Sequence, residues 1–179
     1  MPGAVPRTTL THVTLGLGWD PVRSGKFRRR AKDIDLNAAA LSFRGQDFVD
    51  IAYHEQLTSR DGAIRHLGDS VDGVGDGDDE LIVTDLTRLD PAVTTIVFLI
   101  TCYTGQPFDR IENGFCRVLD SVTGTELARI DLATAHSHTG LVLGTLHRAD
   151  RDWTFTYVAE PITAQHVADA VPHLTAYLN

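Results

Sequence analysis

The sequence predicts an all-β protein, a two-sheet antiparallel β-sandwich with a short helical segment at its C-terminus. Most apolar runs are short, rich in Val, Ile, Thr and Phe, and separated by Gly, Pro, Asp or Asn. This is the pattern of strands joined by turns. Many short strands with almost no helix favour two stacked antiparallel sheets. The length of 179 residues, with 42% hydrophobic content, is close to the size of one domain, so we expect residues 1–179 to form a single domain.

The apolar runs predict nine strands. Because the run 94–103 is apolar on both faces, we expect it to lie at the centre of its sheet. Turn residues at 121–124 predict a hairpin between the strands on either side, and 148–152 reads as a second, polar hairpin turn. In chain order, the predicted strands are 11–17, 36–43, 48–53, 81–86, 94–103, 114–120, 126–132, 140–148 and 153–159.

The C-terminus carries the one helical pattern. Val167, Val171, Leu174 and Leu178 follow one another at spacings that place them on one face of a helix. Pro172 falls inside this pattern, and a proline in a helix interior costs about 3 kcal/mol. We therefore expect two short helical pieces or a kink there.

Composition and charge exclude several classes of partner. The formal net charge of −8 argues against nucleic acid and anionic membrane, and favours cations. The longest apolar run, 96–102, is far shorter than the roughly 20 residues that span a bilayer, so no membrane insertion is expected. The N-terminus lacks the pattern of a signal peptide, which predicts a cytoplasmic protein. Cys102 and Cys116 match no zinc or redox spacing and are expected to be buried free thiols.

A dense acidic loop at 68–80 carries the strongest functional signal. It holds six carboxylates and no cationic residue, and glycines punctuate it. Unit charges 4 Å apart near a surface interact by about 4 kcal/mol, so close packing of carboxylates requires a compensating cation. Calcium accepts six to eight oxygen ligands in a flexible shell, and glycines let the backbone turn its carbonyls inward. The loop therefore predicts a calcium site.

The loop has three other possible interpretations. An EF-hand is rejected because Val71 and Gly73 stand where side-chain ligands belong and Val74 stands where the invariant glycine belongs. Magnesium prefers few carboxylates and retained water, so calcium leads. A solvated acidic turn without a ligand stays open, although this cluster is internal and tightly bounded by apolar residues, whereas acidic tails usually lie at chain ends.

A second acidic element precedes the predicted strand 36–43. Asp33, Asp35 and Asn37 alternate, so they face the same side of an extended chain and could complete the calcium shell. Asp20, at the end of the first strand, is a third contributor. The alternative for these residues is a polar strand start or a turn that faces water.

These motifs resemble the TerD family, the calcium-binding module of tellurite-resistance and stress-response proteins. The loop Gly-Asp-Ser-Val-Asp-Gly-Val-Gly-Asp-Gly-Asp-Asp-Glu is similar to the family pattern GDNLTGxGDGDDE. The segments Leu-Gly-Leu-Gly-Trp-Asp and Asp-Leu-Asn-Ala-Ala-Ala resemble the family's VGLGWD and DLDASA. The resemblance covers about 11–159, with further matching motifs at 105–108, 113–118, 123–129 and 153–155.

The resemblance implies a β-sandwich with paired calcium sites and no established catalytic chemistry. It implies protein partners but does not identify them. Asn37 replaces a family aspartate and Ser70 a family asparagine, which puts the second site in doubt and leaves one or two ions open. Asp72 replaces a threonine and could restore the lost charge. The ligands implied by matching positions are Asp20, Asp35, Asn37, Asp69, Asp76, Asp78, Asp79 and Glu80.

The function predicted is therefore a calcium-binding, non-enzymatic stress-response module that presents a metal-ordered surface to partners. The alternative is a metal-dependent hydrolase that uses the acidic cluster. No nucleophile elbow, zinc-protease helix or P-loop is found, so no catalytic residue is proposed. The eight histidines are scattered, and the close pair His136 and His138 is interpreted as part of a surface loop. A small-molecule sensor has no positive residue signal and ranks last.

Overall fold

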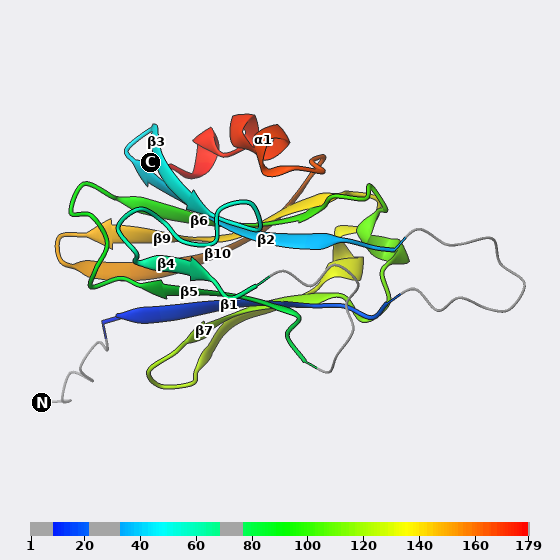
Figure 1. The fold of residues 1–179 in the computed structure, drawn as a ribbon, viewed down its shortest axis with the longest axis horizontal. Coiled ribbons are helices and arrows are strands. Elements are labelled where there is room, and N and C mark those ends of the chain that lie inside the picture. Colours follow the sequence, from blue (N-terminus) through cyan, green and yellow to red (C-terminus); the bar gives the residue numbers. More distant parts are fainter. Residues whose placement is uncertain (1–8, 22–32, 69–76, 179) are drawn as a thin grey trace, which may run out of the picture.

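The computed structural model describes residues 9–21, 33–68 and 77–178, which fold into two five-stranded antiparallel sheets (Figure 1). The first sheet has the order β4 (Ile64–His66), β5 (Glu80–Asp85), β1 (His12–Gly18), β7 (Phe115–Asp120) and β8 (Glu126–Asp131). The second has the order β10 (Asp152–Ile162), β9 (Gly140–Ala149), β6 (Thr95–Cys102), β2 (Leu36–Arg44) and β3 (Asp47–Ala52). The predicted fold class is confirmed.

The predicted strands are confirmed within a few residues at their ends, and one strand was missed. β6 is central, and the β7–β8 and β9–β10 pairs are hairpins as expected. The count of nine was wrong because β4 also exists. It has only three residues, with exposed Arg65 between two buried neighbours, and is too short to show a period.

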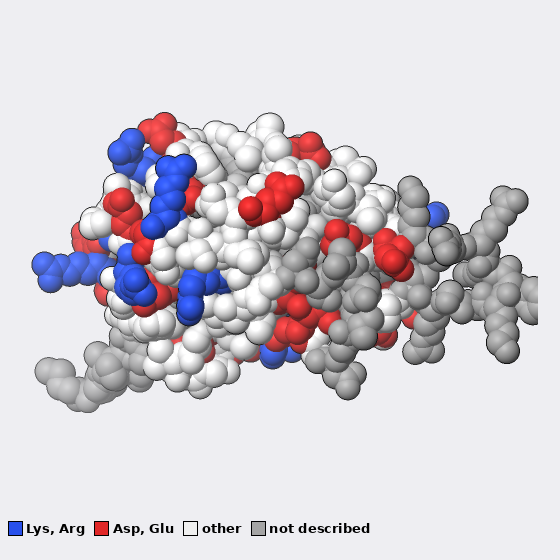
Figure 2. All heavy atoms as spheres, viewed as in Figure 1, with Lys and Arg blue, Asp and Glu red and all other residues white. Residues whose placement is uncertain are grey.

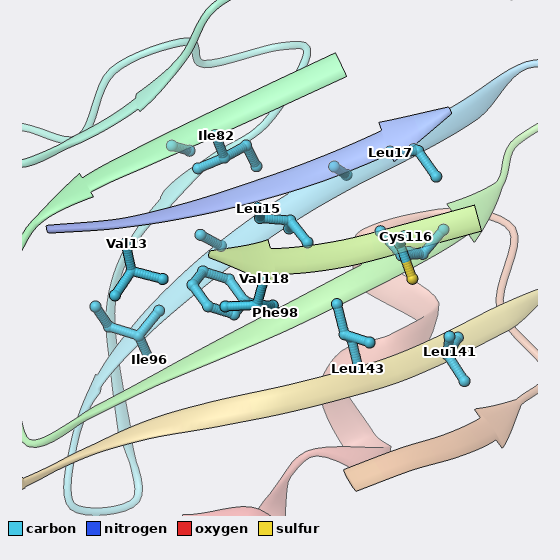
Figure 3. Packing of buried hydrophobic residues seen from close by; sticks show 14 of the residues in the cluster. Val13, Leu15, Leu17, Ile82, Ile96, Phe98, Cys116, Val118, Leu141 and Leu143 are labelled. Atoms are coloured by element: carbon cyan, nitrogen blue, oxygen red, sulfur yellow. The ribbon is translucent and has the colours of Figure 1, made fainter. Parts of the chain in front are cut away.

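The main core lies between the two sheets. Side chains alternate along each strand, so every second residue of β1, β6 and β7 enters this layer. Figure 3 shows side chains from both sheets meeting there. Those labelled are Val13, Leu15, Leu17, Ile82, Ile96, Phe98, Cys116, Val118, Leu141 and Leu143. Both cysteines are buried free thiols, as predicted, and burial raises the pKa of the Cys116 thiol.

A second core covers the outer face of the second sheet. Leu41, Val97 and Leu99 point away from the first sheet and pack with Leu174 and Leu178 of the C-terminal segment, residues 163–178. Figure 1 shows this segment lying across that sheet. Because β2 and β6 are buried on both faces, they are mostly apolar rather than alternating.

The C-terminal segment is broken into short helices, as Pro172 predicted. It contains α1 (Val167–Ala170) and the 3₁₀ helices η3 (Val171–His173) and η4 (Thr175–Tyr177), with Pro172 in the first turn of η3. The break shifts the helical phase, so Val171 is 42% exposed and Ala170 is buried in its place. Two further 3₁₀ helices are η1 (Phe108–Arg110) and η2 (Leu132–Ala135). Among the described residues, no helix is long and apolar enough to cross a membrane.

Candidate metal centre

The acidic loop is the connection of a β-hairpin. β4 and β5 pair antiparallel, and the Leu67 N–H donates to the Leu81 carbonyl at 2.9 Å, which extends the pairing to the base of the loop. The Gly68 N–H donates to Nδ1 of His66 at 3.1 Å. Both ends of the loop are therefore held together on the first sheet. The predicted ligands Asp69 and Asp76, with Ser70 and Asp72, lie outside the described residues.

Asp79 is fixed at the C-terminal end of β1. Its backbone N–H donates to the Leu17 carbonyl at 2.7 Å, and its carboxylate Oδ2 accepts from the Trp19 N–H at 2.9 Å. Because Trp19 precedes Asp20, the loop's last turn lies next to the strand end that the sequence singled out. Two predicted elements, far apart in sequence, are thus brought together here.

Asp78 points to the outer face of the first sheet and forms an ion pair with Arg117. The guanidinium donates twice from Nε, at 3.1 and 3.2 Å, and once from Nη2, at 2.5 Å. This bond to Asp78 is the main reason why the pKa of Arg117 is raised. Arg117 therefore neutralises one loop carboxylate, and no sequence spacing had linked the two residues.

The two glycines of the Leu-Gly-Leu-Gly-Trp-Asp segment make room for the loop. A Cβ on Gly16 would lie 2.6 Å from Oδ1 of Asp78. A Cβ on Gly18 would lie 2.5 Å from the Gly77 carbonyl oxygen and 2.5 Å from the Phe115 ring. Real Cβ contacts are not that close, so β1 must be bare at these two positions for the loop to return across it.

Glu80 points into the sandwich and joins the two sheets. Its Oε2 lies 3.2 Å from Nε2 of His66 and accepts from the Ala38 N–H at 2.9 Å, and the side chains of His66 and Glu80 are fully buried. Since Nδ1 of His66 accepts from Gly68, the neutral ring carries its proton on Nε2 and donates to Glu80. Ala38 belongs to β2, just before the β2–β3 pairing begins at Ala40.

The three predicted ligands outside the loop take different positions. Asp20 accepts from Nδ2 of Asn113 at 2.6 Å. The Asp35 N–H donates to Oγ1 of Thr104 at 3.1 Å. Asn37 is 4% exposed, and neither of its side-chain amide atoms has a hydrogen-bond partner within the described residues.

Strand alternation separates Asn37 from Glu80. Asn37 shares a face of β2 with Ala39 and Leu41, which belong to the outer core under the C-terminal segment. Glu80 approaches β2 from the opposite side, between the sheets, where Leu36 and Ala38 lie. Among the acidic candidates that the structure describes, no three bring their ligand oxygens together. The composite shell predicted from both elements is therefore not assembled by the described residues.

Charged side chains of the described residues are unevenly placed on the face drawn in Figure 2. Acidic side chains lie at both ends of this face, including the end where β1 ends and β5 begins. The basic side chains visible there lie mostly toward the opposite end.

Fold and site together define an all-β sandwich domain with a carboxylate-rich hairpin loop at one end. The sequence profile of the TerD domain matches residues 5–169, and the chain belongs to the TerD domain family. The resemblance inferred from the motifs is confirmed.

Named relatives extend over nearly the whole chain. Tellurium resistance protein TerZ of Serratia marcescens is 37% identical over 168 residues, covering 90% of this chain and 86% of its own. Stress response protein SCP2 of Bacillus subtilis is 31% identical, covering 90% and 88%. The solved structure of SAV2460, a protein of unknown function, superposes with a TM-score of 0.82 at 25% identity, covering 91% of this chain and 96% of that one. The chain is thus a member of a tellurium-resistance and stress-response family.

Proposed function

We propose that this protein is a cytoplasmic, non-enzymatic calcium-binding module whose acidic loop, once ordered by the ion, presents a surface to protein partners. The observation that carries the proposal is the closed base of the loop. Five carboxylates occupy the connection between β4 and β5, Glu80 follows as the first residue of β5, and the Leu67–Leu81 hydrogen bond joins the two ends. An ion bound there would offset this negative charge and take carboxylate oxygens as ligands.

The loop holds six carboxylates and no cationic residue, and a divalent cation suits such a set of oxygens. Two of these carboxylates are engaged in the fold, because Arg117 pairs with Asp78 and His66 bonds to the buried Glu80. We assign Asp69, Asp76 and Asp79 as the principal ligands, with Asp20 at the adjoining end of β1.

The remaining predicted ligands receive other roles in this proposal. Asp78 and Glu80 anchor the loop's second arm, one on the outer face of the first sheet and one between the sheets. Asp35, just before β2, and Asn37, within β2, remain the candidate ligands of a second ion. We therefore propose one strong calcium site, and the stoichiometry of calcium binding will show whether a second ion binds.

The names of the relatives support the stress-response part of the proposal. TerZ and SCP2 are named for tellurium resistance and stress response, and neither name is that of an enzyme. Partner binding would follow from where the two ends of the loop lie, at the end of the sandwich where β1 ends and β5 begins (Figure 1). A metal-ordered loop there would present its surface to a partner.

Calcium-dependent thermal unfolding tests this proposal. Calcium at about 100 times its Kd should stabilise the folded state by about 2.7 kcal/mol, which for a chain of this size raises Tm by about 5–10 °C. In Asp76→Asn/Asp79→Asn the rise should vanish. The amide that Asp79→Asn introduces keeps an oxygen that can accept from the Trp19 N–H, so the metal-free Tm should change little.

The matched control is Asp47→Asn, which removes one carboxylate at an exposed position with only a 3.8 Å pairing to Arg44. This variant should keep the full calcium response. An equal calcium response in the loop double variant and in wild type would show that the ion, if bound, is not held by this loop.

A further inference from the structure

A second group of metal-ligating side chains lies away from the acidic loop, on the outer face of the second sheet. His54 and Glu55 follow β3, and His166 is the N-cap of α1 in the C-terminal segment. One potential ligand atom from each of the three residues lies within 4.8 Å of the others. Nothing in the spacing of the scattered histidines predicts this group, because the fold alone brings position 166 to position 54.

The ring nitrogens lie around the carboxylate at ion-pair distances. Nε2 of His54 lies 3.9 Å from Oε1 of Glu55, and Nε2 of His166 lies 3.6 Å from Oε2. One ligand atom from each residue lies within 4.8 Å of the other two, whereas ligand atoms around a tetrahedral ion with bonds of 2.0–2.1 Å lie about 3.3 Å apart. Side-chain movements of about 1–2 Å would therefore bring all three onto one ion.

We propose that His54, Glu55 and His166 form a site for a divalent transition metal of the zinc type, separate from the calcium loop and independent of its function. Two imidazoles and one carboxylate are a donor set that zinc accepts, with a fourth position left for water. Imidazole also disfavours calcium and magnesium, which take oxygen ligands. The two sites are therefore chemically selective for different ions.

Surrounding rings restrict the motion of the ligands. The centroid of the Tyr53 ring lies 5.1 Å from that of His54 and 6.1 Å from that of His166, and the Tyr103 ring lies 6.3 and 6.4 Å from the same two. The Tyr53 hydroxyl donates to Oε2 of Glu55 at 2.7 Å and is the main reason why the pKa of Glu55 is lowered. The carboxylate is thus held ionised and oriented, as a ligand must be.

Metal binding would compete with one existing hydrogen bond. Nδ1 of His166 accepts from the Ala168 N–H at 3.1 Å and caps α1, so the neutral ring carries its proton on Nε2. A metal on Nε2 moves that proton to Nδ1, and the Ala168 amide loses its acceptor. In exchange, the ion would join the end of β3 to the start of α1 and so hold the C-terminal segment on the second sheet.

Zinc titration of the full chain, with calcium present in excess, tests the proposal. Wild type should bind one Zn²⁺ saturably, and His54→Asn and His166→Asn should each weaken binding by at least about tenfold. An asparagine side chain at position 166 can still cap α1, so the metal-free fold should be kept. Glu55→Gln gives a third variant at an exposed position, and its amide oxygen can still accept from the Tyr53 hydroxyl, so the metal-free fold should be kept. His173→Asn, in the same segment but outside the group, is the matched control and should bind like wild type.

Two further readouts separate ligation from a structural effect. Zinc should raise the Tm of wild type and of His173→Asn but not of the ligand variants. It should also shift the Ala168 amide resonance of wild type. The proposal is overturned if wild type shows no saturable zinc binding, if the ligand variants bind as tightly as wild type, or if His173→Asn weakens binding as much as they do. Because calcium binding is not part of these readouts, failure of either site is visible separately.

Discussion

Among single residues, Gly16 and Gly18 show most clearly how sequence and site are connected. Neither is required by a positive φ; both are required because the returning acidic loop occupies the space that a side chain would fill. At Gly16 the neighbour is the carboxylate of Asp78, which is itself held by Arg117. The glycines of this motif therefore serve the loop, although they lie in a different strand.

Gly16→Ala should destabilise the protein by about 1–3 kcal/mol, because the new methyl group would displace Asp78 from Arg117. Denaturant unfolding measures this loss. In the background of Asp78→Ala, which removes the atoms that the methyl group meets, the same substitution should cost clearly less. Additive losses in this double-mutant cycle would mean that Gly16 is needed for another reason.

Among the elements, the C-terminal segment differs most from what its sequence pattern predicts. The sequence predicts a helical face with Val171 and Leu174 on it, but the break at Pro172 exposes Val171 and leaves Leu174 fully buried. The segment forms a third layer over β2 and β6, and the N-cap of its first helix is His166 of the second candidate metal site. Apolar packing and the proposed metal site would therefore both hold the C-terminal segment on the second sheet.

Leu174→Ala should cost about 2–5 kcal/mol in unfolding free energy, because it opens a cavity in the outer core. Val171→Ala, three residues away on the same segment, should stay within about 0.5 kcal/mol of wild type. Chemical denaturation of the two variants makes the comparison. Equal losses at both positions would contradict the docking described here.

For the whole molecule, the sequence predicts the sandwich and the acidic loop but not how they are joined. The strand pattern and the loop composition are local signals, so both are readable from the chain. The pairing of Asp78 with Arg117 and of Glu80 with His66 depends on tertiary contacts across and between sheets, which no spacing encodes. Asn37 was predicted as a ligand because it alternates with Asp35 and matches a family position. Alternation alone cannot say which face of β2 it takes, and the structure places it on the face of Ala39 and Leu41. The contact between His54 and His166 could not be predicted, because it depends on how the C-terminal segment packs on the second sheet.

The central claim is that the acidic loop binds calcium, and calorimetric titration of metal-stripped protein with Ca²⁺ tests it most directly. We expect saturable binding of one calcium ion at a strong site. Because Asn37 and Ser70 replace family ligands, any second ion should bind more weakly. The strong site should be lost in Asp69→Asn/Asp76→Asn. No saturable calcium binding, or a strong site that survives in that variant, would contradict the account.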